Sequence, residues 1–263
     1  MIPIYKPFIT KESIEYVNAA LESGWLCHKG YFVEAASNWL KEFLGVNYVL
    51  LLNSGTAGCH LLARTIRQFY PEINNIICPN YVYVAAWNGF IYENFLLDIE
   101  GFDEYTWNRS GCSFPENSVV LIVHNLGNII NVPKLKSENP TCTFIEDACE
   151  AFGGMYGGQK AGSASLASCF SFYANKSVTS AEGGCFVTNR KEIYDYAKLV
   201  HGQGMGSVQY IHDTLGYNYR MNNISAALLL GQLEAYDEID SRKTIIFNNY
   251  RKAFRNLDFC AIL

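Results

Sequence analysis

The chain has 263 residues, of which 49% are hydrophobic and 17% charged, and its net charge is −5. The acidic balance argues against nucleic acid or an anionic membrane as the main partner, because both require a basic face. No stretch approaches the roughly 18 apolar residues of a membrane helix, and the first residues lack the pattern of a signal peptide.

Nine cysteines are scattered along the chain without a C-x-x-C pair or a paired Cys/His spacing. Zinc sites and disulfide frameworks usually show such spacings, so we expect neither, and no metal. Several cysteines stand inside apolar runs and resemble small buried hydrophobes. This pattern favours a reducing compartment, and we expect a cytoplasmic protein.

The predicted elements begin with helices in the first forty residues. Over 10–24, Thr10 or Ser13 is a candidate cap and Gly24 a stop. Apolar runs predict strands at 48–55, 75–80, 118–127, 142–148, 167–173 and 183–189, and helical patterns cover 56–70, 190–202 and 223–254. The apolar run 257–263 resembles a strand entering another unit.

The strands are continuously apolar and alternate with helices. Such strands are typical of a sheet covered on both faces, and the alternation predicts a mostly parallel α/β fold. In these sheets the functional groups gather at the carboxyl ends of the strands.

The turn "NSGTAG" (53–58) is the first candidate site, because it joins a predicted strand to a predicted helix. Small residues at a helix N-terminus present free backbone N–H groups to a phosphate. The alternative is a plain turn in which Ser54 or Thr56 caps the helix.

The run "FIEDACEAFGG" places Asp147 at the end of an apolar strand. A partly buried carboxylate there needs a cationic or hydrogen-bonding partner, because desolvation is costly. The alternative is that Asp147 caps a helix over 148–154.

The run "FSFYANKSVTSAEGG" places Ser171 and Lys176 just beyond another strand. Alone, a loop lysine is most simply exposed to solvent. Together, a phosphate turn, a strand-end acid, a serine and a lysine are the groups that pyridoxal phosphate (PLP) requires.

The chain resembles the DegT/DnrJ/EryC1/StrS family of nucleotide-sugar aminotransferases, which have the aspartate aminotransferase fold (PLP-dependent fold type I). The ordered runs that carry the resemblance include "SGWLCHKG", "NSGTAG", "PNYVYVAAWN", "VHNLG", "IEDACEAFGG", "FSFYANK" and "GYNYRMNNISAALLLGQLE". They cover nearly the whole chain. "QGM" followed by "GYNYRMNNISAA" is most similar to the 4-aminotransferases that make perosamine from a GDP-4-keto-6-deoxyhexose.

The resemblance implies that Lys176 is the Schiff-base lysine and proton shuttle, and that Asp147 pairs with the pyridine nitrogen. It implies that Tyr83 stacks on the cofactor and that Glu150 stands where the family contacts the phenolic oxygen. The phosphate would be held by Gly55, Thr56, Ala57 and Ser171, and by Asn218 of a neighbouring subunit, which implies a homodimer with shared active sites. Arg220 is either a substrate-binding residue or an interface arginine.

Two positions depart from the family pattern. Glu150 replaces the usual Gln or His, and a second acid near Asp147 could raise the pKa of one of the two carboxyls. Ala181 replaces a glycine, which predicts an unstrained backbone at that position.

The resemblance further implies a PLP-binding large domain over 1–235 and, over 236–263, a long helix with the start of a truncated C-terminal domain. The expected reaction transfers an amino group from L-glutamate, which leaves 2-oxoglutarate, to a keto sugar nucleotide. GDP-4-keto-6-deoxymannose and dTDP-4-keto-6-deoxyglucose are candidates. Members that dehydrate the sugar carry His in place of this lysine. The alternatives are a truncated, non-catalytic homologue that binds a cofactor or a partner, and an unrelated nucleotide-binding α/β enzyme; no G-x-G-x-x-G motif supports the latter.

Overall fold

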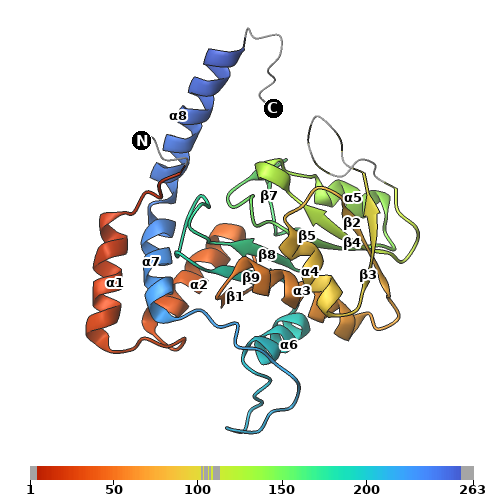
Figure 1. Ribbon diagram of the computed structural model, residues 1–263, viewed down its shortest axis with the longest axis horizontal. Coiled ribbons are helices and arrows are strands. Elements are labelled where there is room, and N and C mark those ends of the chain that lie inside the picture. Colours follow the sequence, from red (N-terminus) through yellow and green to blue (C-terminus); the bar gives the residue numbers. More distant parts are fainter. Residues whose placement is uncertain (1–4, 102, 104–105, 107, 109–112, 256–263) are drawn as a thin grey trace.

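A seven-stranded sheet with helices packed against it forms the body of the molecule (Figure 1). This computed structural model describes residues 5–101, 103, 106, 108 and 113–255. The strand order is β1-β9-β8-β5-β4-β2-β3, and β9 runs antiparallel to both of its neighbours while the other pairs are parallel. The strands are β1 (Tyr48–Leu52), β2 (Asn75–Pro79), β3 (Leu96–Glu100), β4 (Val119–Val123), β5 (Thr143–Asp147), β8 (Ser168–Ser171) and β9 (Gly184–Thr188). The predicted mostly parallel α/β fold is confirmed.

Strand β1 shows that both faces of the sheet are covered. Val49 and Leu51 join a core on one face, together with residues of α1 (Lys11–Ser23), α2 (Tyr31–Leu44) and α7 (Asn223–Glu234). Leu50 and Leu52 join a second core on the other face, with α3 (Gly55–Phe69), α4 (Val84–Tyr92) and α6 (Lys191–His201). Because successive side chains of a strand point to opposite faces, a strand buried on both sides is apolar at every position.

The remaining elements are shorter or lie at the edge of the body. They are the 3-10 helix η1 (Asn125–Gly127), α5 (Val132–Glu138), α8 (Tyr236–Phe254) and a two-stranded hairpin of β6 (Met155–Tyr156) and β7 (Gln159–Lys160).

The predicted caps of the first helix are found in α1. Thr10 is the N-cap, and its Oγ1 accepts a hydrogen bond from the Ser13 backbone N at 3.0 Å. Gly24 ends the helix with φ +69°, a left-handed conformation that glycine adopts without steric cost. The cap is therefore Thr10 rather than Ser13.

The single helix predicted over 223–254 is wrong, because α7 ends at Glu234 and α8 begins at Tyr236. The break places Tyr236 against Phe43 and Phe152, with ring centroids 4.8 and 5.6 Å apart. Beyond it, α8 extends away from the body, and Ile239 is its one buried residue (Figure 1). The division into domains at 235 stays a prediction, and the strand predicted at 257–263 lies outside the described residues.

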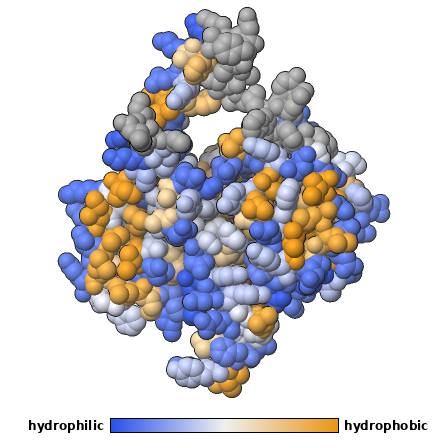
Figure 2. Space-filling view, in the orientation of Figure 1, coloured by the Kyte–Doolittle hydropathy of each residue, from blue (hydrophilic) through white to orange (hydrophobic). Residues whose placement is uncertain are grey.

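Apolar side chains also reach the surface. Figure 2 shows them gathered over α1 and over the region of β3, where Ile14, Leu21, Leu96 and Ile99 are each more than half exposed. These areas contribute nothing to the cavity described below. Within the described part of the chain, no helix combines the length and apolar character needed to cross a bilayer.

Candidate active site

A cavity of about 410 Å³ opens at the carboxyl edge of the parallel strands. The segments that follow β1, β2, β4, β5 and β8 all contribute to its walls, as this sheet architecture requires. The lining residues are Ser54, Gly55, Thr56, Cys59, Tyr83, Ala85, Val123, His124, Asn125, Asp147, Cys149, Glu150, Ser171, Tyr173, Asn175, Lys176, Glu182 and Gly183.

Most of the predicted site residues meet in this cavity. Seven of them line it: Gly55, Thr56, Tyr83, Asp147, Glu150, Ser171 and Lys176.

Three predicted residues lie outside the cavity lining. Ala57 is buried in the first turn of α3, and its backbone N donates to the Ser54 Oγ at 3.1 Å. Asn218 and Arg220 lie beside the end of β1: Asn53 Nδ2 donates to the Asn218 carbonyl, and Arg220 pairs with Leu52. The roles of Asn218 toward a neighbouring subunit and of Arg220 toward substrate stay predictions.

Asp147, the last residue of β5, forms part of the cavity wall, with 6% of its surface exposed. Its Oδ1 accepts from the Cys149 backbone N at 3.0 Å, and its Oδ2 lies 3.8 Å from the Cys59 Sγ, which donates to it. Burial, followed by the influence of Cys149, raises the pKa of this carboxyl well above its usual range, and Lys176 opposes the shift. The alternative of a helix cap is wrong, because no helix forms over 148–154.

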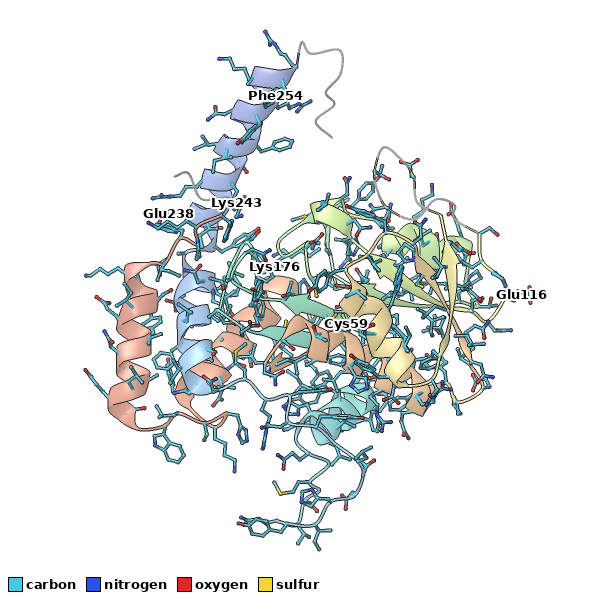
Figure 3. All side chains as sticks on the ribbon, viewed as in Figure 1. Cys59, Glu116, Lys176, Glu238, Lys243 and Phe254 are labelled. Carbon is cyan, nitrogen blue, oxygen red and sulfur yellow. The ribbon has the colours of Figure 1, made fainter. Side chains whose placement is uncertain are left out.

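Lys176, labelled in Figure 3, follows β8 on a loop and lines the cavity. Its side chain is 21% exposed, so it is partly buried rather than fully solvated, and its role toward a cofactor stays a prediction. Its backbone holds the loop, because its N–H donates to the Tyr173 carbonyl at 2.9 Å and its carbonyl accepts from the Tyr5 hydroxyl at 2.9 Å.

The capped N-terminus of α3 lies beside two hydroxyl side chains, Thr56 of its own first turn and Ser171 at the end of β8. Ser54 is the N-cap, as the plain-turn interpretation predicted. A Cβ on Gly55 would lie 2.8 Å from the Ser171 Cβ, so glycine at this position is what lets Ser171 approach the helix. The N-terminus of α3, Thr56 and Ser171 therefore meet in the cavity, and their role toward a phosphate stays a prediction.

Glu150 faces Lys176, with its Oε1 3.6 Å from the Lys176 Nζ. Its Oε2 accepts from the Leu126 backbone N at 2.9 Å. We expected that Glu150, as a second acid, could raise the pKa of a neighbouring carboxyl. The pKa of Asp147 is raised, but the causes are burial and Cys149.

A buried His–Glu pair beside the cavity was not singled out from the sequence. His124, in the quoted run "VHNLG", lies with its Nε2 2.8 Å from the Glu146 Oε2, and its Nδ1 accepts from the Ile130 backbone N. The Nε2 therefore carries the proton and donates a hydrogen bond to the carboxylate. Burial acts to raise the pKa of Glu146, but hydrogen bonds from His124, Ser165 and the Gly162 backbone outweigh it, and the pKa is lowered.

The backbone expected to be unstrained at Ala181 is instead left-handed, with φ +68°. The Ala181 N–H donates to the Thr179 Oγ1 at 3.0 Å, which holds this turn in place. The next two residues, Glu182 and Gly183, line the cavity. The strain therefore lies in the segment that shapes the cavity wall.

The fold and the cavity define a PLP-dependent transferase of fold type I. More closely, the chain belongs to the DegT/DnrJ/EryC1/StrS aminotransferase family, whose model matches residues 7–262. The predicted family, fold class and enzyme class are confirmed.

Individual relatives agree with this assignment. The GDP-perosamine synthase of Escherichia coli O157:H7 is 35% identical over 266 residues, which cover 97% of this chain and 72% of that protein. The structure of Helicobacter pylori PseC, an aminotransferase of pseudaminic acid biosynthesis, superposes with a TM-score of 0.89 at 28% identity, covering 97% of this chain and 71% of that one. Spr1654 from Streptococcus pneumoniae, known in a PLP form, shares the fold with a TM-score of 0.86 at 24% identity, covering 97% and 72%.

Proposed function

We propose that this chain transfers an amino group from L-glutamate to a 4-keto-6-deoxyhexose carried on a nucleotide, with PLP bound in the cavity. The sugar nucleotide would be GDP-4-keto-6-deoxymannose or dTDP-4-keto-6-deoxyglucose. The observation that carries the proposal is that Lys176 and Asp147, which come from different strand ends, line one cavity. The GDP-perosamine synthase relative, at 35% identity, favours the GDP sugar.

The polar groups that line the cavity fit PLP. Among the described residues, no cationic side chain forms an ion pair with Asp147, and burial raises its pKa. A protonated pyridine nitrogen would supply the missing positive charge and keep the carboxylate ionised. At the other side, the N-terminus of α3 with Thr56 and Ser171 suits a phosphate.

When bound, PLP supplies an electron sink that makes an α-proton of the amino donor acidic. Lys176 would hold the cofactor covalently and, once released, carry a proton between the α-carbon of the donor and the cofactor. Asp147 would keep the ring nitrogen protonated. Glu150, whose Oε1 lies 3.6 Å from the Lys176 Nζ, would help to position the Lys176 side chain in the cavity until substrate enters.

Further residues would bind and orient the cofactor and the substrates. Tyr83, 76% exposed at the cavity, would stack on the cofactor ring and shield it from water. Glu150 would also contact the phenolic oxygen. Asn218 would complete the phosphate site of a neighbouring subunit, so that the active unit is a homodimer, and Arg220 would bind the amino donor or the sugar nucleotide.

The test is a panel of 4-keto and 3-keto sugar nucleotides incubated with PLP and L-glutamate, with the amino sugar and 2-oxoglutarate detected by mass spectrometry. Lys176→Ala should abolish product, while Lys252→Ala, on the exposed face of α8, should leave turnover unchanged. Product from Lys176→Ala, or a yellow protein that glutamate does not bleach, contradicts the proposal. The second outcome favours a non-catalytic cofactor-binding homologue.

A further inference from the structure

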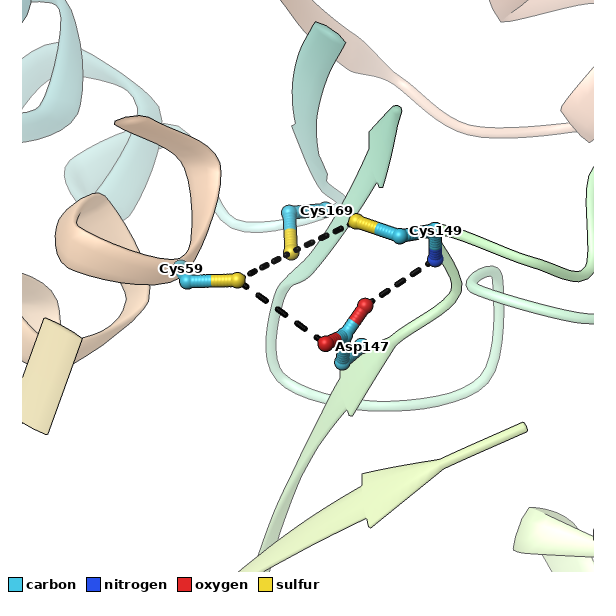
Figure 4. A group of neighbouring side chains, drawn as sticks. All are labelled: Cys59, Asp147, Cys149 and Cys169. Atoms are coloured by element: carbon cyan, nitrogen blue, oxygen red, sulfur yellow. Dashed lines mark hydrogen bonds between the residues drawn. The ribbon is translucent and has the colours of Figure 1, made fainter. Parts of the chain in front are cut away.

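Three cysteine thiols and the Asp147 carboxylate converge on one point at the cavity wall (Figure 4). Cys59 comes from the second turn of α3, Cys169 from β8, and Cys149 from the loop after β5. The three sulfurs and a carboxylate oxygen all lie within 4.8 Å of one another. Sequence spacing gave no sign of this cluster, because its members are far apart in the chain and meet only at the edge of the sheet.

The distances within the cluster approach those of a tetrahedral metal centre. The Cys59 and Cys169 sulfurs are 3.8 Å apart, those of Cys149 and Cys169 4.0 Å, and the Cys59 sulfur lies 3.8 Å from the Asp147 Oδ2. Zn–S bonds of about 2.3 Å in a regular tetrahedron place two sulfurs about 3.8 Å apart. Two of the sulfur–sulfur edges therefore already match, and rotation of short side chains is enough to adjust the rest.

We propose that Cys59, Cys149, Cys169 and Asp147 form a binding site for a thiophilic divalent cation such as Zn²⁺ or Cd²⁺. Metal–sulfur bonds replace S–H bonds, the released protons pass to solvent, and no electron is transferred. Three sulfur ligands with one oxygen select soft or borderline cations over Mg²⁺ and Ca²⁺.

Burial and access both suit such a site. Cys59, Asp147 and Cys169 are buried, which protects the ligands from competing water. Cys59, Asp147 and Cys149 line the cavity, so a cation has an entry path. The Asp147 Oδ1 is held by the Cys149 N–H at 3.0 Å, which leaves the Oδ2 directed at the sulfurs.

The metal site shares Asp147 with the proposed pyridine-nitrogen site. This part of the inference rests on the proposed function. The Asp147 Oδ1 already accepts from the Cys149 N–H, so the Oδ2 is the oxygen left for either ligand, and the cation and the PLP ring nitrogen compete for it. A thiophilic cation would thus inhibit loading of the cofactor.

The experiment titrates the full chain, freed of cofactor and kept anaerobic, with Cd²⁺ alone while the ultraviolet thiolate-to-cadmium absorption is followed. The expected result is one Cd²⁺ per chain, and a tetrahedral thiolate spectrum when Co²⁺ replaces it. Cys169→Ala should lower the Cd²⁺ affinity at least about tenfold. The matched control is Cys78→Ala, on β2, because Cys78 is equally buried but lies outside the cluster.

Thermal unfolding without metal establishes that each variant is folded, and Cys149→Ala takes the place of Cys169→Ala if the latter is not. Unchanged Cd²⁺ affinity in a folded cluster variant, or an octahedral Co²⁺ spectrum, overturns the site. Addition of PLP should release Cd²⁺, and retention of both ligands overturns the antagonism. A chain that binds Cd²⁺ as expected but never binds PLP would overturn the proposed function and leave the metal site standing.

Discussion

Replacing Glu146 with glutamine tests the buried network beside the cavity. The Glu146 carboxylate is 1% exposed and accepts three hydrogen bonds. Its Oε2 accepts from the His124 Nε2 and the Gly162 N, both at 2.8 Å, and its Oε1 accepts from the Ser165 N at 3.0 Å. A glutamine has one accepting oxygen, so it cannot accept at both positions.

The loss of stability expected for Glu146→Gln follows from the number of hydrogen bonds that the glutamine can still accept. With its oxygen in the place of Oε2, the glutamine amide keeps two bonds, which become neutral and weaker. Its NH₂ group then faces the Ser165 N–H, and a donor is left without an acceptor. An unsatisfied buried group costs about 1–3 kcal/mol, so we expect Glu146→Gln to lower the free energy of unfolding by roughly 2 kcal/mol.

The pH dependence of this loss provides a second signature. The folded pKa of Glu146 is lowered, so its stabilisation is fully present above the unfolded pKa of about 4.3 and is lost as pH falls through the folded pKa. The difference between wild type and variant should therefore be largest near neutral pH and shrink in acid.

Urea unfolding followed by circular dichroism at a series of pH values measures both effects. Glu138→Gln is the matched control, because Glu138 lies on the exposed face of α5 and pairs with Lys134 only at 3.7 Å. A loss below about 0.5 kcal/mol, or a difference that stays constant into acid, would refute the reasoning, since surface substitutions alone produce changes of that size.

Three further changes test the cavity walls. Ala181→Gly should raise the free energy of unfolding by about 0.5–1 kcal/mol in urea, because φ +68° costs alanine more than glycine loses in chain entropy; a decrease would show that the turn is not strained. Gly55→Ala should weaken PLP binding at least about tenfold in a spectroscopic titration, because the added Cβ would lie 2.8 Å from the Ser171 Cβ. An unchanged affinity would show that the phosphate does not bind at this turn. Asp147→Asn should slow amino transfer by about 10²-fold or more in the mass-spectrometric assay, and near-normal turnover would disconnect this carboxylate from the ring nitrogen.

The buried strands were predictable from the sequence because burial on both faces leaves most of their residues apolar. Strands β4 and β5 fall inside the predicted ranges. Strand β3 was missed, because it lies at the edge of the sheet and carries polar residues such as Asp98 between its apolar ones. The break at Ala235 was also missed, because helix propensity continues through it and only the packing of Tyr236 against Phe43 marks the new helix.

Some cavity residues could be predicted because their side-chain type and their place near the end of a strand indicate a chemical role. Lys176 and Asp147 are examples. The left-handed turn at Ala181 was not, because alanine gives no local signal for a positive φ and the turn is held by a hydrogen bond to Thr179. The pairing of His124 with Glu146 was not predictable either. Adjacent parallel strands β4 and β5 bring these two residues together, and the sequence carries no record of that register.

The cysteine cluster shows why spacing rules for metal ligands fail in a sheet of this kind. Those rules detect ligands presented by one turn or one hairpin, where chain separation and spatial separation agree. Here Cys169 on β8 lies beside the end of β5, because Asp147 pairs with Cys169 across the parallel ladder, and Cys59 reaches both from the helix packed on that face. The topology that gathers groups for a cofactor at the carboxyl edge thus also gathers sulfur ligands behind Asp147. Asp147 belongs both to the proposed cofactor site and to the cysteine cluster. A metal ion held by the cysteines and a cofactor ring would therefore compete for the same carboxylate.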